Sequence, residues 1–90
     1  MSEIVTEMFG SHQVQAMEFV ITNESGFRPD AINKSSGACG MPQSLPCSKM
    51  NCELSFEGAE CQLRWMASYV KNRYGTPLQA QAFWQEKHWY

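Results

Sequence analysis

Residues 39–61, with the sequence CGMPQSLPCSKMNCELSFEGAEC, decide the fold because they hold all four cysteines of this 90-residue chain. The cysteines are spaced C-x7-C, C-x4-C and C-x8-C. A zinc site usually supplies paired C-x2-4-C hooks, and only the middle spacing comes close to that pattern. Two disulfide bonds are therefore the preferred interpretation, and a zinc site is the alternative.

Four cysteines allow three pairings, and we expect Cys39–Cys47 with Cys52–Cys61. Each of these bonds closes a short local loop, and the second would tie a loop to the start of a helix. A domain of this size buries only roughly 60–65% of the surface that its unfolded chain exposes, so its core is small. A disulfide adds ~2–4 kcal/mol of stability to such a domain, and it implies a location outside the reducing cytosol.

Helical periodicity precedes this cysteine-rich segment. Residues 2–9 predict a short helix that ends at Gly10. A second helix is expected to start after the N-cap Ser11 and to run to about residues 23–25, where Gly26 ends it. Apolar residues recur along one face of this second helix: Val14, Met17, Phe19, Val20 and Ile21.

Helical periodicity returns at Ala59 and predicts a third helix that ends before Gly75. Its apolar and aromatic positions are Leu63, Trp65, Met66, Tyr69 and Val70. Residues 76–79, Thr-Pro-Leu-Gln, supply an N-cap, a first-turn proline and a capping-box glutamine for a last helix that reaches about Lys87. We expect Leu78, Ala82 and Phe83 of this last helix to face inwards.

Residues 26–58 are rich in Gly, Pro, Ser and Asn and predict a long irregular loop. We expect one or two helical turns near residues 42–50 and at most a minimal β-hairpin near residues 33–40. A loop of this length in a compact domain is usually functional. The hydrophobic fraction of 43% and aromatic fraction of 12% are typical of a globular protein. The sequence thus predicts a single, mainly α domain over residues 1–90.

Composition excludes several classes of function. The net charge is -2, from 7 basic and 9 acidic residues without a long run of either sign, which argues against nucleic-acid binding. No apolar stretch approaches the ~20 residues that a membrane-spanning helix needs. The first residues lack the basic start and apolar core of a secretion signal. We therefore expect a mature form, a fragment of a longer protein, or a protein released by another route.

Glu24 stands where the second predicted helix ends, and it is the candidate catalytic residue. A carboxyl group that is held at a helix end and partly desolvated can stay protonated near neutral pH, as a general acid must. The helix macrodipole also disfavours a negative charge at this end. The alternative is a solvated surface carboxylate.

Ordered motifs surround and follow Glu24. They read Glu24-Ser25-x-Phe27-x-Pro29-x-Ala31-x-Asn33, then SSGACGMPQSLPCSKM over residues 35–50, YVKNRYGTP over residues 69–77 and AFWQEKHWY over residues 82–90. Together they resemble the lytic transglycosylases of the lysozyme superfamily, in particular a compact group found in Gram-positive cell-wall proteins and in phage tail or tape-measure proteins. The resemblance covers residues 14–90.

The resemblance implies a small lysozyme-like fold and a peptidoglycan substrate that is cut at the β-1,4 bond between N-acetylmuramic acid and N-acetylglucosamine. It implies Glu24 as the acid and then the base, with no metal and no organic cofactor. The sugar's own 2-acetamido and 6-hydroxyl groups would complete the reaction and give a 1,6-anhydro product. A hydrolytic muramidase of the same fold and a non-catalytic wall-binding or tail module are the alternatives.

The resemblance also implies a setting for the protein. We expect it to be extracellular, at the cell wall, either secreted or associated with a virion through a larger phage tail protein. Its partners would be the glycan strands of the wall, and we expect the chain to be a monomer.

Further site residues follow from their places in these motifs. Gln43 matches the glutamine of the family's Gly-Leu-x-Gln motif and is expected to bind the sugar, with a helix-capping role as the alternative. Ser25 and Asn33 are assigned to the same binding region, Ser25 mainly to fix the helix end. Asp30 is the candidate second carboxylate, although an aspartate after a proline more often caps a turn.

The aromatic residues are divided between packing and binding. Tyr69 and Trp84 are expected near the cleft, although aromatic side chains in a small domain more often pack in the core. The chain departs from the family at residues 82–84, where Ala-Phe-Trp replaces an Ala-Tyr-Asn motif whose hydroxyl lies near the acid. Tyr69, Tyr74 or Tyr90 would have to supply that hydroxyl. The two histidines, His12 and His88, are most simply surface residues.

Overall fold

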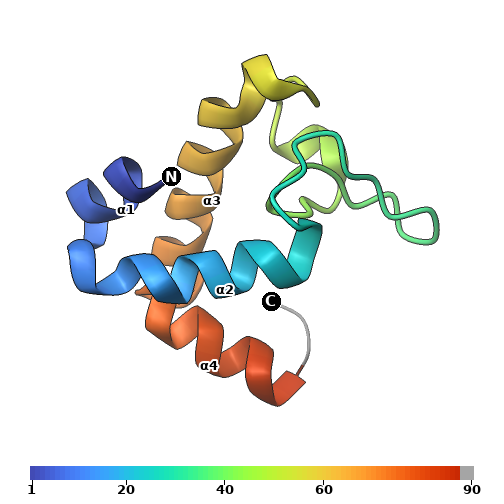
Figure 1. Ribbon diagram of the computed structural model, residues 1–90. Helices are drawn as coiled ribbons and strands as arrows, with labels where there is room; N and C mark the ends of the chain where they lie inside the picture. Colours follow the sequence, from blue (N-terminus) through green and yellow to red (C-terminus); the bar gives the residue numbers. More distant parts are fainter. Residues whose placement is uncertain (88–90) are drawn as a thin grey trace.

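The computed structural model describes residues 1–87, which form four α-helices and three short 3-10 turns. The α-helices are α1 (Ser2–Phe9), α2 (Val14–Ser25), α3 (Ala59–Arg73) and α4 (Pro77–Lys87), and the 3-10 turns are η1 (Ser11–Gln13), η2 (Cys47–Lys49) and η3 (Phe56–Gly58). Helices α2 and α4 lie side by side, and the long loop between α2 and α3 projects beyond the end of α2 (Figure 1). The predicted mainly α fold is confirmed.

One apolar core joins the four helices. Val20, Ile21, Met66 and Val70 are fully buried at its centre. Burying such a side chain completely stabilises the fold by about 1.5–3 kcal/mol relative to leaving it exposed. Met41 brings the long loop into the same core, so the loop is anchored to the helices by packing as well as by covalent bonds.

The predicted start of α2 was wrong, and the predicted end was correct. Ser11 is not the N-cap, because the chain makes the turn η1 first and α2 begins at Val14 without a side-chain cap. The C-terminal end is as expected. Gly26 takes a left-handed conformation (φ 63°), and its N–H is within hydrogen-bonding distance of the carbonyls of Ile21 (3.2 Å) and Thr22 (3.0 Å).

The inward face of α4 was predicted incorrectly at two of three positions; the third, Phe83, is partly buried, with its ring centroid 5.2 Å from that of Tyr74. Leu78 and Ala82 are exposed, and Pro77 and Ala80 are buried instead. The reason is a long-range contact at the start of the helix, where the buried carboxamide of Gln13 accepts a hydrogen bond from the N–H of Leu78 (2.9 Å). This bond supplies a partner for one of the unpaired N–H groups at the helix start, and it fixes which face of α4 meets α2.

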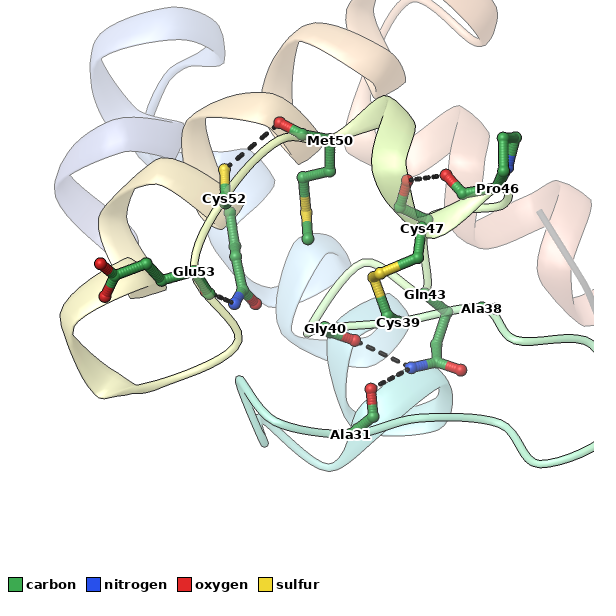
Figure 2. The surroundings of a disulfide bond; sticks show 12 residues. Ala31, Ala38, Cys39, Gly40, Gln43, Pro46, Cys47, Met50, Cys52 and Glu53 are labelled. Atoms are coloured by element: carbon green, nitrogen blue, oxygen red, sulfur yellow. Dashed lines mark hydrogen bonds between the residues drawn. A yellow bond between two sulfur atoms is a disulfide. The ribbon is translucent and has the colours of Figure 1, made fainter.

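Both predicted disulfides are present, Cys39–Cys47 and Cys52–Cys61. They consume all four cysteines, which excludes the zinc alternative. Cys39 forms isolated β-bridges with Ile32 and with Ser44, so the hairpin is as small as expected. Figure 2 shows the Cys39–Cys47 bond beside the turn that carries Gln43. No helix within residues 1–87 is long and apolar enough to span a membrane.

Candidate active site

Glu24 is the penultimate residue of α2, and its half-buried side chain lines a cavity of about 360 Å³. The cavity lies between the end of α2 and the loop that follows it. Its lining residues are Asn23, Glu24, Asn33, Ser36, Ala38, Gln43 and Leu45. Three predicted site residues, Glu24, Asn33 and Gln43, therefore meet at one cavity.

Helix α4 supplies a hydrogen-bond donor to this carboxyl group. The indole Nε1–H of Trp84 donates to Oε2 of Glu24 at 3.0 Å. The indole is itself held edge-on against the ring of Phe19 on α2, with ring centroids 5.5 Å apart and planes at 84°. Within residues 1–87, Oε2 is the only oxygen of the Glu24 carboxyl with a hydrogen-bond partner. Trp84 thus orients the carboxyl. It does not itself line the cavity, so its predicted role in binding the substrate stays a prediction.

The environment of Glu24 favours its protonated form. Burial raises the pKa of the Glu24 carboxyl above its ordinary value, and the hydrogen bond from Trp84 lowers the pKa and partly offsets this effect. The position at the carboxyl end of α2 acts in the same direction as burial, because the helix macrodipole disfavours a negative charge there. A carboxyl group with a raised pKa can carry a proton at a higher pH than an exposed one, which is the property a general acid needs.

Gln43 lies across the cavity with its amide nitrogen already bonded. Its Nε2 donates to the carbonyls of Gly40 (2.9 Å) and Ala31 (3.4 Å), which fixes the side chain. Figure 2 shows the carboxamide oxygen on the side of the group away from these two carbonyls. The amide bonds two loop carbonyls and caps no helix, so the alternative role is wrong as stated, and the side chain lines the cavity. The carboxamide oxygen is suited to accept a hydrogen bond from a ligand.

Gln62, which holds the loop to α3, was not among the residues predicted from the sequence. Gln62 is fully buried, accepts from the N–H of Met41 (2.8 Å) and donates to the carbonyls of Pro29 (3.0 Å) and Glu53 (2.7 Å). Gly40 lies directly against it, since a Cβ there would be 2.8 Å from Oε1. The available signal was position: Gln62 continues the buried stripe of α3, four residues before Met66.

The other predicted residues have more local roles. Ser25 is buried, and its hydroxyl donates to the carbonyl of Ile21 (3.3 Å), which fixes the helix end as expected. Asn33 lines the cavity, but its Oδ1 accepts the N–H groups of Ser35 (2.8 Å) and Ser36 (3.1 Å). Asp30 is exposed and does not line the cavity, so the structure does not bring a second carboxylate to Glu24 from this position.

Tyr69 lies at a different cavity from Glu24. It stacks on Trp65, with ring centroids 5.2 Å apart and an angle of 18° between the planes. Among the described residues, the donor beside Glu24 is an indole N–H from Trp84 and not the hydroxyl of Tyr69. His12 is exposed, as predicted. His88 and Tyr90 lie outside the described residues.

No protein-family profile, curated protein or solved structure matches this chain. The chemistry of the cavity around Glu24 is therefore the basis for assigning a function.

Proposed function

We propose that this protein is a lytic transglycosylase, which cleaves the β-1,4 bond between N-acetylmuramic acid and N-acetylglucosamine in peptidoglycan. The observation that carries the proposal is the half-buried Glu24 carboxyl, which lines a cavity, has a raised pKa and is oriented by Trp84. The cavity volume of about 360 Å³ lies within the range of small-molecule sites.

The reaction would proceed in two proton transfers through one residue. Glu24 gives its proton to the glycosidic oxygen as the bond to C1 of the muramic acid breaks, and the sugar's 2-acetamido oxygen supports the positive charge at C1. The Glu24 carboxylate then takes the proton of the 6-hydroxyl group, whose oxygen attacks C1 and closes the 1,6-anhydro ring. The proton returns to Glu24, and no water is consumed. The hydrogen bond from Trp84 would stabilise the carboxylate between the two steps.

The composition of the cavity favours this mechanism over hydrolysis. Among the residues that the structure describes, Glu24 is the only acidic side chain that lines the cavity. Inverting and covalent glycosidases place two carboxyl groups about the scissile bond. A site with one carboxyl is better suited to a substrate that supplies its own second group. Gln43 would accept a hydrogen bond from a sugar hydroxyl or amide through its carboxamide oxygen.

The setting that we propose is the cell wall, reached by secretion or as part of a phage tail. The two disulfides support an oxidising environment. Neither a metal nor an organic cofactor takes part in the reaction as written.

Digestion of purified peptidoglycan followed by mass spectrometry tests the proposal. The wild type should release muropeptides with anhydro ends, which are lighter by one water than products with reducing ends. Glu24→Gln should release none and still sediment with the wall. The matched control is Glu18→Gln, which removes an exposed carboxylate from the same helix and should leave cleavage unchanged.

Each of the other outcomes points to a different function. Reducing ends would identify a hydrolytic muramidase. Wall binding without cleavage by the wild type would identify a non-catalytic module and would refute the role of Glu24.

A further inference from the structure

A second cavity, of about 430 Å³, lies against the C-terminal half of α3 and shares no lining residue with the cavity of Glu24. Its walls come from α3 and from the short turn η2. The lining residues are Lys49, Trp65, Ser68, Tyr69, Asn72 and Arg73. Nothing in the proposed reaction at Glu24 uses these side chains.

One wall of this cavity is an ordered ladder of side chains along α3. Trp65, Tyr69 and Arg73 are spaced four residues apart and so lie above one another on the helix. The first two rings are stacked, and the guanidinium carbon of Arg73 lies 5.8 Å from the ring centroid of Tyr69 and 5.6 Å from that of Tyr74. Contacts of a guanidinium with ring faces are attractive. The ladder therefore limits the rotamers of Arg73 before any ligand arrives.

The charged residues that line this cavity are both cations. Lys49 brings an ammonium group from the loop side and Arg73 brings a guanidinium from α3, while none of the six lining residues is acidic. Ser68 and Asn72 add a hydroxyl and a carboxamide on α3. An arginine presents paired N–H donors that match the oxygens of a carboxylate or a phosphate, and a lysine adds a point charge. Two cations with polar donors beside an aromatic wall are the chemistry of an oxyanion site.

We infer that this cavity is a second binding site, which takes a carboxylate or phosphate group carried on an extended ligand. The identity of the ligand rests on the proposed function. If the substrate is peptidoglycan, the group is either a carboxylate of the peptide on the muramic acid or a phosphate of a wall polymer. Binding at this site would hold the wall on the enzyme while the glycan strand occupies the cavity of Glu24.

The test is a titration followed by NMR chemical shifts, with muramyl dipeptide as the carboxylate probe and inorganic phosphate as the phosphate probe. Neutral N-acetylglucosamine is the uncharged control. At least one anionic probe should bind at millimolar concentration and shift signals of Trp65, Ser68 and Asn72. Lys49→Gln and Arg73→Gln should each weaken that binding by about tenfold, because each removes one charged hydrogen-bonding group.

Lys71→Gln is the matched control, since Lys71 is an exposed cation on α3 that does not line the cavity. Equal effects of the three substitutions would indicate a general charge effect and would overturn the site. Binding of the neutral probe with the same affinity, or no binding of either anion, would overturn it too. Lys49 is exposed on a short turn, so its variant remains informative if Arg73→Gln is unstable.

The same titration in Glu24→Gln separates this inference from the proposed function. Anion binding that depends on Lys49 and Arg73 supports the second site even if the wild type cleaves no peptidoglycan. Cleavage with anhydro products but without such anion binding leaves the catalytic proposal intact and refutes the second site.

Discussion

Replacing Gln62 with leucine should strongly destabilise the protein, although leucine has a similar size and is apolar. The substitution removes three hydrogen bonds of a fully buried side chain, to the N–H of Met41 and to the carbonyls of Pro29 and Glu53. A buried backbone group that loses its partner costs ~1–3 kcal/mol. Three such groups give about 3–9 kcal/mol, and we expect about 3–5 kcal/mol because the loop relaxes and water reaches some of them.

This loss is a large fraction of the total, since a domain of 90 residues has a stability of roughly 5–13 kcal/mol. Urea denaturation at pH 7 without reductant, followed by circular dichroism at 222 nm, measures it. Gln15→Leu is the matched control, because Gln15 is exposed on α2, and it should change the free energy of unfolding by less than about 0.5 kcal/mol.

A loss below about 1 kcal/mol in Gln62→Leu would refute the reasoning. It would show that the three hydrogen bonds do not hold the loop against α3. A second readout is cleavage of peptidoglycan below the denaturation midpoint. If Gln62 positions the turn that carries Gln43, cleavage should fall even while the variant remains folded.

Four further predictions concern the site and its support. Replacing both Cys39 and Cys47 with alanine should lower the free energy of unfolding by about 2.5 kcal/mol, because the unfolded chain regains the entropy of a loop with a sequence separation of 8. An almost unchanged Tm in thermal denaturation would contradict this. Because the pKa of Glu24 is raised in the folded state, the wild type should lose stability as the pH rises from about 4.5, the ordinary value, through the raised pKa. Glu24→Gln should lack this loss and be the more stable protein above that interval, as urea titrations at acidic and neutral pH will show. Trp84→Phe removes the donor to the carboxylate but retains a ring against Phe19, so the pKa of Glu24 should rise further, and the alkaline limb of the pH–rate profile should move to higher pH. Gly26→Ala should lower the free energy of unfolding by about 1 kcal/mol through backbone strain alone, because φ is 63° and no atom beyond the neighbouring residues lies within 4 Å of the added methyl group. Asparagine tolerates this backbone conformation better than alanine, so Gly26→Asn should cost less. An equal or larger loss in Gly26→Asn, measured by the same urea titration, would contradict strain as the cause.

The features that sequence predicted well depend on local rules. The helices follow from apolar periodicity, the end of α2 from Gly26, and both disulfides from the closure of short loops between neighbouring cysteines. Each of these depends on residues that are close together in the sequence. Glu24, Asn33 and Gln43 line one cavity. These three residues were grouped by the motifs in which they stand, because local rules do not relate residues so far apart in the sequence.

The features that sequence missed are set by contacts between distant residues. The inward face of α4 depends on Gln13, which bonds the N–H of Leu78 at a separation of 65 residues. The loop depends on Gln62, whose partner Met41 is 21 residues away. A glutamine among buried apolar positions of a helix cannot be assigned a role from sequence until its hydrogen-bond partners are known. In this protein, Gln13 and Gln62 are such residues, and both form long-range hydrogen bonds.

The bond between Trp84 and Glu24 joins residues that are 60 positions apart, so it forms only when α4 has docked on α2. Local detachment of α4 takes the indole donor away, although Glu24 keeps its place in α2. The pKa of this single carboxyl group therefore depends on the docking of a helix that comes much later in the chain. The acid of the proposed reaction is thus sensitive to the packing of the last helix, and Trp84→Phe isolates the part of that sensitivity that comes from the donor.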